Sequence, residues 1–174
     1  LTYRWTHPPT NAVLVAEEGM DEVLTRTEGG VQSTQVWRYP ARSECLQCHT
    51  PAAGWALGFS TRQLHRDVDF GNVTESQIHR LAEAGYFENP PEERHTLVAL
   101  AAATNETASI EWRVRSWLDA NCAACHQPGG SALGTWDARA ETPLTQTGLI
   151  DGALNNDWGD PLNRLVAPGV PEHT

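Results

Sequence analysis

The segments ECLQCH (residues 44–49) and NCAACH (residues 121–126) decide how this chain of 174 residues is interpreted. Both contain the pattern Cys-x-x-Cys-His, and together they hold all four cysteines of the chain. Chance supplies far fewer than one such pentapeptide in a chain of this composition, so the repetition requires a chemical reason. Residues 45–49 are called the first motif below, and residues 122–126 the second motif.

The spacing of two thiols and a following imidazole meets the needs of covalent haem attachment. Two thiols three residues apart can reach the two vinyl groups of one porphyrin, and the adjacent histidine can bind the iron axially. We therefore expect two covalently bound haem c groups. The expected attachment residues are Cys45, Cys48, Cys122 and Cys125. The expected proximal iron ligands are His49 and His126.

Three other uses of four cysteines remain open from the sequence. Zinc could take all four thiols, but zinc ribbons rarely separate their cysteine pairs so widely and need no trailing histidine. Two disulfides in a secreted protein are a further alternative. A thiol-redox site would be expected to follow a strand and open a helix, as in thioredoxin, and that pattern is absent here.

Charge and hydropathy exclude several classes of partner. The net charge is −10, so an acidic surface would repel nucleic acid and anionic lipid, although it would suit a basic patch on a redox partner. The same acidity also serves solubility. No apolar run approaches the ~20 residues of a membrane-spanning helix. The chain starts at Leu1 with no signal-peptide pattern, and we interpret it as a processed or excised piece.

The pattern of residue types changes at Pro40. Short β-favouring runs separated by turn residues fill residues 1–40 and predict a small antiparallel meander. Helical patterns follow, and residues 89–93 (NPPEE) form the best boundary candidate. The predicted helices cover residues 41–49, 60–67, 74–87 and 109–126. The last carries an apolar stripe that is expected to need a cover, consisting of Ile110, Val114, Trp117 and Leu118.

The two motifs and their flanks resemble a known family. Residues 37–67 (WRYPARSECLQCHTPAAGWALGFSTRQLHRD) and 114–130 (VRSWLDANCAACHQPGG) are similar to the diheme c-type cytochromes associated with PQQ-dependent sugar-dehydrogenase-like β-propellers. The resemblance implies an exported, periplasmic or extracellular electron-transfer protein that is paired with or fused to a dehydrogenase. The sequence departs from the family at one point. In the family, a segment like PGVPE (residues 168–172) is normally followed by a last helix and a Met-Pro segment, whereas this sequence stops at Thr174, before both.

We therefore expect a mainly α fold with two cytochrome c-like haem lobes and a small N-terminal antiparallel β meander. The expected domains are the meander in residues 1–40, the first haem lobe in 41–90 and the second in 91–174. The second lobe is expected to be incomplete at its C-terminal end. A shared cover over the apolar stripe, provided by the helix in residues 74–87, is expected to join the lobes.

The sixth iron ligands are less well defined by the sequence. For the first haem, His65 lies in the loop where a distal ligand is expected, with Met20 and His79 as alternatives. For the second haem, the chain after the motif offers only His173, and we expect instead a ligand that lies beyond Thr174 or comes from another chain. His7 and His95 are expected at the surface.

The expected function is non-catalytic electron transfer. The alternatives are a diheme peroxidase-type enzyme and a β-rich interaction module in which the haems have only a structural role.

Overall fold

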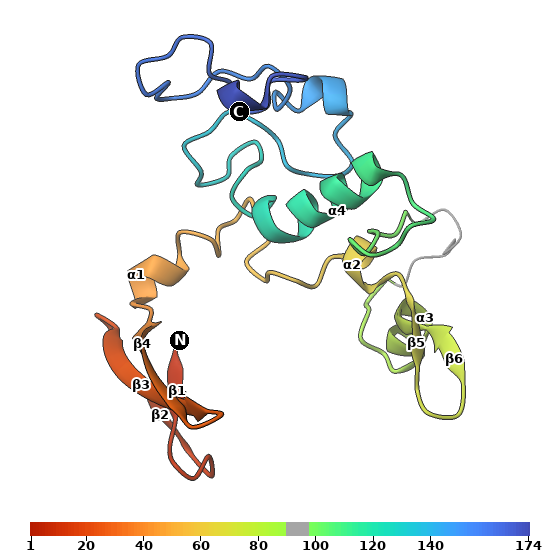
Figure 1. The fold of residues 1–174 in the computed structure, drawn as a ribbon. Helices are drawn as coiled ribbons and strands as arrows, with labels where there is room; N and C mark the ends of the chain where they lie inside the picture. The colour runs from red at the N-terminus through yellow and green to blue at the C-terminus, as the bar shows by residue number, and fades with distance from the viewer. Residues whose placement is uncertain (90–97) are drawn as a thin grey trace. The chain divides into compact units, whose positions relative to one another are not determined.

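The computed structural model describes residues 1–89 and 98–174, which form two compact units. The first unit is Leu1–His49 and the second is Thr50–Thr174. The first motif therefore closes the first unit, and the second motif lies within the second unit (Figure 1). The expected boundary between residues 90 and 91 and the expected surface position of His95 lie outside the described residues.

The prediction of a mainly α fold is wrong. The described residues contain four short α-helices, which with the helical turns make 20% helix, and about 20% strand in small antiparallel sheets. Frequent glycine and proline residues explain much of the difference, because they interrupt the helical periodicity after each motif. Beyond residue 123, the only helical segments are two short 3₁₀ turns, Leu144–Gln146 and Pro171–His173.

Residues 1–40 form two separate two-stranded antiparallel sheets instead of one four-stranded meander. The chain passes from one sheet to the next through Gly19, whose φ is 75°. A Cβ at this position would lie 2.5 Å from the carbonyl oxygen of Tyr39, so the close approach requires glycine. The strands are β1 (Tyr3–Trp5), β2 (Ala12–Leu14), β3 (Met20–Glu28) and β4 (Val31–Tyr39).

The long β3–β4 hairpin turns at two glycines. Glu28 pairs with Val31, so Gly29 and Gly30 form a two-residue loop. Both have positive φ, 57° and 81°, as the preferred hairpin turn with a right-handed twist demands. At the other end of the hairpin, Met20 pairs with Tyr39.

A short helix, α1 (Arg42–Cys45), follows the hairpin and delivers the first motif. The Glu44 carboxylate accepts a hydrogen bond from the backbone N–H of Ala41 and another from the Arg38 guanidinium at 2.9 Å. These two interactions hold the pKa of Glu44 below its usual value. The helix start is thereby tied to the last strand of the hairpin. The predicted helix over residues 41–49 does begin after Pro40, but it ends at Cys45 and is shorter than expected.

The second unit begins with two capped helices and a small hairpin. Ser60 caps α2 (Thr61–Leu64), and its hydroxyl accepts a hydrogen bond from the N–H of Gln63. The predicted helix over residues 74–87 is shorter in the structure, because residues 74–76 pair as a strand and Ser76 is the helix cap. The other elements are β5 (Asp67–Asp69), β6 (Thr74–Ser76) and α3 (Gln77–Glu83).

The longest helix is α4 (Ile110–Cys122), which ends at the first cysteine of the second motif. Ser109 caps it and accepts a hydrogen bond from the N–H of Trp112 at 3.1 Å. Its start and its junction with the motif agree with the sequence prediction. Its orientation does not, because the buried residues of α4 are Arg115 and Ser116.

Three of the four residues of the apolar stripe of α4 are exposed and Leu118 is half-buried, which corrects the expectation that α3 covers the stripe. Ile110 is 73% exposed, Val114 52% and Trp117 57%. The opposite face is held inward by polar contacts: Arg115 donates to two carbonyl oxygens, and the Ser116 hydroxyl accepts from the N–H of Ala101 at 2.9 Å. These hydrogen bonds decide the orientation of α4, since breaking them would leave buried polar groups unsatisfied.

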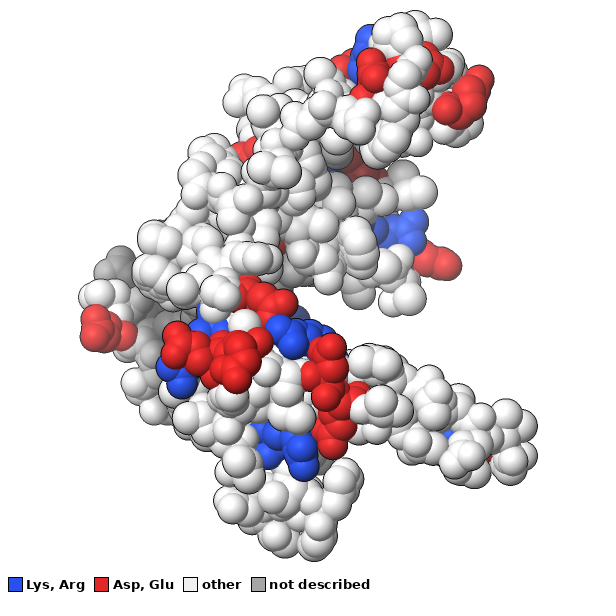
Figure 2. All heavy atoms as spheres, turned by 90° about the vertical axis from the view of Figure 1, so that its left-hand side faces the viewer, with Lys and Arg blue, Asp and Glu red and all other residues white. Residues whose placement is uncertain are grey.

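Two properties of the described residues bear on possible partners, namely the apolarity of the helices and the distribution of charge. Among the described residues, no helix combines the length and apolarity needed to cross a bilayer. Acidic and basic side chains lie next to each other on the face shown in Figure 2. In the first unit, Arg38 pairs with Asp21 and Glu44, and Arg42 pairs with Glu17. Local pairing of this kind weakens the negative field near these carboxylates and leaves the net charge unchanged.

Candidate functional site

The two motifs adopt the same backbone geometry. In each, the second cysteine and the histidine donate their N–H groups to the carbonyl oxygen of the first cysteine, which closes one helical turn. The distances are 3.3 Å and 3.0 Å for Cys48 and His49, and 3.1 Å and 2.8 Å for Cys125 and His126. Residues three and four apart on a helical turn share a face. Each turn therefore presents two thiols and an imidazole together.

The helices position the motifs in equivalent ways. Cys45 is the last residue of α1, and Cys122 is the last residue of α4. Both helices end at the first thiol, and the remaining residues of each motif form one further turn through their hydrogen bonds to the carbonyl oxygen of that cysteine. The sequence prediction that each motif lies at a helix end agrees with this arrangement.

The motifs differ in their surroundings. Cys48 and His49 of the first motif are exposed, whereas Cys125 and His126 of the second are half-buried. Burial also raises the pKa of the Cys122 thiol, with a smaller contribution from Cys125. A raised pKa opposes the thiolate that a redox-active Cys-x-x-Cys site needs. The thiol-redox alternative is therefore disfavoured at the second motif.

The zinc alternative gains no support from the geometry. All four cysteines are present as thiols. In the stretches 1–89 and 98–174, no group of three or more His, Cys, Asp or Glu side chains is placed to hold a metal ion. Neither unit by itself brings together, in its described residues, the four ligands that a structural zinc site needs.

The imidazole of His126 is packed against an aromatic ring. The ring of Trp136 stacks on it, with centroids 4.4 Å apart and an angle of 29° between the planes. The Nδ1 atom of His126 is buried and has no hydrogen-bond partner. The sequence did not identify Trp136, since nothing in its spacing distinguishes it from the other six tryptophans.

Three of the candidate sixth ligands lie in different settings. His65 is the C-terminal cap of α2, and its Nδ1 atom is buried without a hydrogen-bond partner. Met20 opens β3 in the first unit. His79 lies on α3, and its Nε2 atom is 2.9 Å from the Glu83 carboxylate. The Nδ1 atom of His79 is also buried without a hydrogen-bond partner, so both rings have one unpartnered nitrogen, and they differ in the contact of His79 Nε2 with Glu83.

His173 is engaged by the chain itself. Its Nδ1 atom lies 3.3 Å from the Asn163 side-chain oxygen and 3.4 Å from the Asp160 carboxylate. Its carbonyl oxygen accepts a hydrogen bond from the N–H of Arg164 at 2.8 Å. These contacts fix the ring within the C-terminal loops, so that Nε2 is the nitrogen left for a metal.

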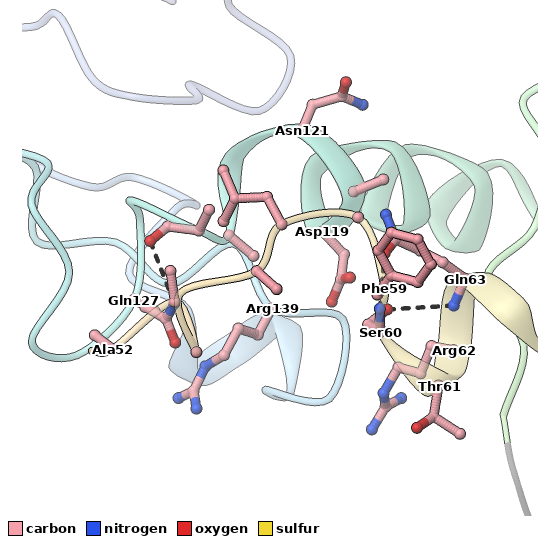
Figure 3. Close-up of a pocket in the computed structure, with 18 of the residues that line it drawn as sticks. Ala52, Phe59, Ser60, Thr61, Arg62, Gln63, Asp119, Asn121, Gln127 and Arg139 are labelled. Atoms are coloured by element: carbon pink, nitrogen blue, oxygen red, sulfur yellow. Dashed lines mark hydrogen bonds between the residues drawn. The ribbon is translucent and has the colours of Figure 1, made fainter. Parts of the chain in front are cut away.

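A hollow of about 600 Å³ lies in the second unit between the segment around residues 52–63 and the C-terminal part of α4. Alanine and glycine line much of it, and Figure 3 shows Asp119 and Arg139 beside the segment that carries Phe59 and Ser60. The volume is in the range of ligand pockets. Its arginines are already paired, however, since Arg62 bonds Glu141 at 3.0 Å and Arg139 bonds Asp137.

Comparison of the chain with protein-family models, with curated proteins and with solved structures found no match. The functional argument therefore rests on the two motifs and on their surroundings.

Proposed function

We propose that this protein is a diheme c-type cytochrome that carries electrons between redox partners. The observation that supports the proposal most strongly is the identical helical turn formed by the two motifs. Each turn places two thiols and an imidazole on one face, which is the arrangement that covalent haem attachment requires. Thiol-redox chemistry is disfavoured at the second motif by the raised pKa of the Cys122 thiol, and neither unit by itself groups the ligands of a structural zinc site in its described residues.

The residues of each motif fit the group. Cys45 and Cys48 would hold one haem, and Cys122 and Cys125 the other. The orphaned ring nitrogen and the half-buried ring of His126 suit an axial ligand, because a neutral imidazole can bind iron through one nitrogen. His49 would have the same role in the first motif. A bound haem supplies reversible one-electron oxidation and reduction of its iron.

The chain's own residues provide attachment, orientation and apolar surroundings. Helix α4 fixes the position of the second motif, because Arg115 ties the helix to the carbonyl oxygens of Arg139 and Thr142 at 2.7 Å and 2.6 Å. His65 is the proposed sixth ligand of the first haem, because it lies in the loop after the first motif and, unlike His79, forms no ion pair with a carboxylate of the described residues. Large apolar side chains also remain exposed near the motifs in sequence, such as Leu46 and Leu133. Such surface commonly contacts a ligand or partner.

The proposed partners are proteins of the electron-transfer chain. By its resemblance to dehydrogenase-associated cytochromes, the protein would receive electrons from a dehydrogenase and pass them to another cytochrome or terminal acceptor. The proposed location is the periplasm or the cell exterior, for which the chain would be exported. The net charge of −10 favours a partner with a basic docking surface.

The test is the haem content and redox behaviour of the protein matured with a haem c attachment system. The pyridine haemochrome assay should give two haems per chain that remain after acidic organic extraction. Voltammetry should show two reversible one-electron processes. A colourless protein with one bound zinc would contradict the proposal. Peroxide turnover far above that of free haem would replace the carrier function with a peroxidase.

A further inference from the structure

The contact between Trp136 and His126 depends on a glycine two residues before the tryptophan. A Cβ at Gly134 would lie 3.1 Å from Cδ1 of Trp136 and 3.4 Å from Cε1 of His126. The separation from Trp136 is tighter than most Cβ contacts, and the separation from His126 is at the lower edge of ordinary van der Waals contact. Because Gly134 has no Cβ, it leaves room for the two rings to stack against each other.

The backbone after Trp136 is fastened to the second motif. The N–H of Ala138 donates to the carbonyl oxygen of His126 at 2.8 Å. The N–H of Asp137 donates to the carbonyl oxygen of Thr147, a residue only 1% exposed, at 2.7 Å. Trp136 is thus held next to His126 by main-chain bonds that do not depend on its own side chain.

A polar turn that follows Trp136 is bound to α4. The Asp137 carboxylate accepts hydrogen bonds from the Arg139 guanidinium at 2.7 Å and from the Thr142 hydroxyl at 2.8 Å. The Asp119 carboxylate of α4 accepts from the N–H of Ala140 at 2.8 Å. Together with the Arg115 bonds to this turn, these contacts connect the Trp136 segment to the helix that carries the second motif.

The stacking matters because His126 lacks the usual means of fixing a ligand ring. A metal-binding histidine normally donates its second ring N–H to a carboxylate or carbonyl group, which sets the orientation of the ring. The Nδ1 atom of His126 is buried and has no such partner. Trp136 contacts the face of the imidazole, so it can restrict rotation of the ring without forming a bond to either ring nitrogen.

We propose that Trp136 is a positioning residue that sets the orientation of the His126 imidazole and, through it, the axial iron bond of the second haem. This inference rests on the proposed function. The first motif provides an internal comparison, because its histidine, His49, is exposed. Changes at Trp136 should therefore affect one haem and leave the other unaltered.

The first experiment examines the stacking without haem. In the full chain produced without haem, NMR should show the ring protons of His126 shifted upfield by the ring current of Trp136. The shift should disappear in Trp136→Leu and persist in Trp136→Phe. It should also persist in Trp158→Leu, a matched change at a tryptophan that is 76% exposed. Identical His126 shifts in Trp136→Leu and the unaltered chain would overturn the inference, whatever the haem content.

The second experiment uses the haem-loaded protein. Trp136→Leu should shift the reduction potential and the electron paramagnetic resonance signal of one haem only, and Trp136→Phe should restore much of both. Gly134→Ala, which retains both rings but pushes between them, should shift the same haem in case Trp136→Leu fails to fold. Unchanged potentials and spectra in Trp136→Leu or in folded Gly134→Ala would overturn the inference. A chain that never acquires haem would instead refute the proposed function.

Discussion

The backbone N–H of His126 donates to the carbonyl oxygen of Cys122 at 2.8 Å. This single bond places the imidazole on the same helical turn as the thiol four residues earlier, and Cys125 joins the turn through a bond to the same oxygen. The equivalent bonds in the first motif form an equivalent turn. Two copies of one local geometry, in two compact units, are the structural basis of the diheme proposal.

Removing one pair of thiols should remove one haem. We expect Cys122→Ala with Cys125→Ala to retain a single covalent haem, because Cys45 and Cys48 form an independent turn in the other unit. The reciprocal variant, Cys45→Ala with Cys48→Ala, is the matched control and should also retain one. The pyridine haemochrome absorbance per chain measures both. If either variant keeps two haems, the motif whose cysteines were replaced is not an attachment site.

Arg115 should be important for stability despite its charge. It is 5% exposed and donates to the carbonyl oxygens of Arg139 and Thr142. We expect Arg115→Ala to lower the free energy of unfolding by about 2–4 kcal/mol, because buried carbonyl groups lose a charged donor. Urea denaturation provides the measurement.

The control for this prediction is Arg80→Ala. Arg80 is about half exposed and forms surface ion pairs with Glu75 and Glu83, so its loss should cost roughly 0–1 kcal/mol. Equal effects of the two substitutions would contradict the proposed role of Arg115 in orienting α4.

The Asp137 carboxyl group should make the stability of the folded protein depend on pH. Hydrogen bonds from Arg139, above all, lower its pKa from 3.8 to about 2. Because the pKa is lower in the folded state than in the unfolded state, the ionised carboxylate stabilises the folded state at pH values above the unfolded pKa. This stabilisation is lost as the pH falls from about 4 to about 2. The shift corresponds to about 2 kcal/mol at neutral pH.

The variant Asp137→Asn should therefore unfold at a lower urea concentration than the unaltered protein at pH 6. The difference should shrink as the pH approaches 2. Asp151→Asn, at an exposed carboxylate, is the control and should change the midpoint little. A difference between Asp137→Asn and the unaltered chain that stays constant over this range would contradict the prediction.

The exposed face of α4 and the buried Ile78 should respond differently to truncation or polar substitution. Val114→Gln should change the free energy of unfolding by no more than ~0.5 kcal/mol, since Val114 is 52% exposed. Ile78→Ala should cost about 2–5 kcal/mol, because Ile78 is fully buried. Urea denaturation again gives both values. A large loss for Val114→Gln would show that the apolar stripe is covered after all.

Local signals in the sequence predicted some elements well and others poorly. Ser60, at the start of residues 60–67, predicts a helix cap, and the structure has it as the cap of α2. The Thr-x-x-Gln pattern that opens residues 74–87 predicts Thr74 as the cap of the third helix, but Thr74 pairs with Asp69 in a hairpin, and Ser76 is the cap. A threonine can serve either purpose, and pairing with a distant strand is not visible in local sequence.

The orientation of α4 illustrates a second limit. Apolar periodicity predicted that Val114 and Trp117 face inward, yet Arg115 and Ser116 are buried because partners for their polar atoms lie in distant segments. The motif residues could be predicted because their chemistry is local. Trp136 could not, since its contact with His126 arises from the path of the intervening loop.

The mass of the denatured chain, after production with a haem c attachment system, tests the central claim most directly. Covalent attachment predicts a single species at the mass of the 19.1 kDa chain plus two haems. Denaturation removes every non-covalent ligand, so this measurement depends only on thioether bonds at the four cysteines. The mass of the chain alone, or of the chain with disulfides only, would contradict the account.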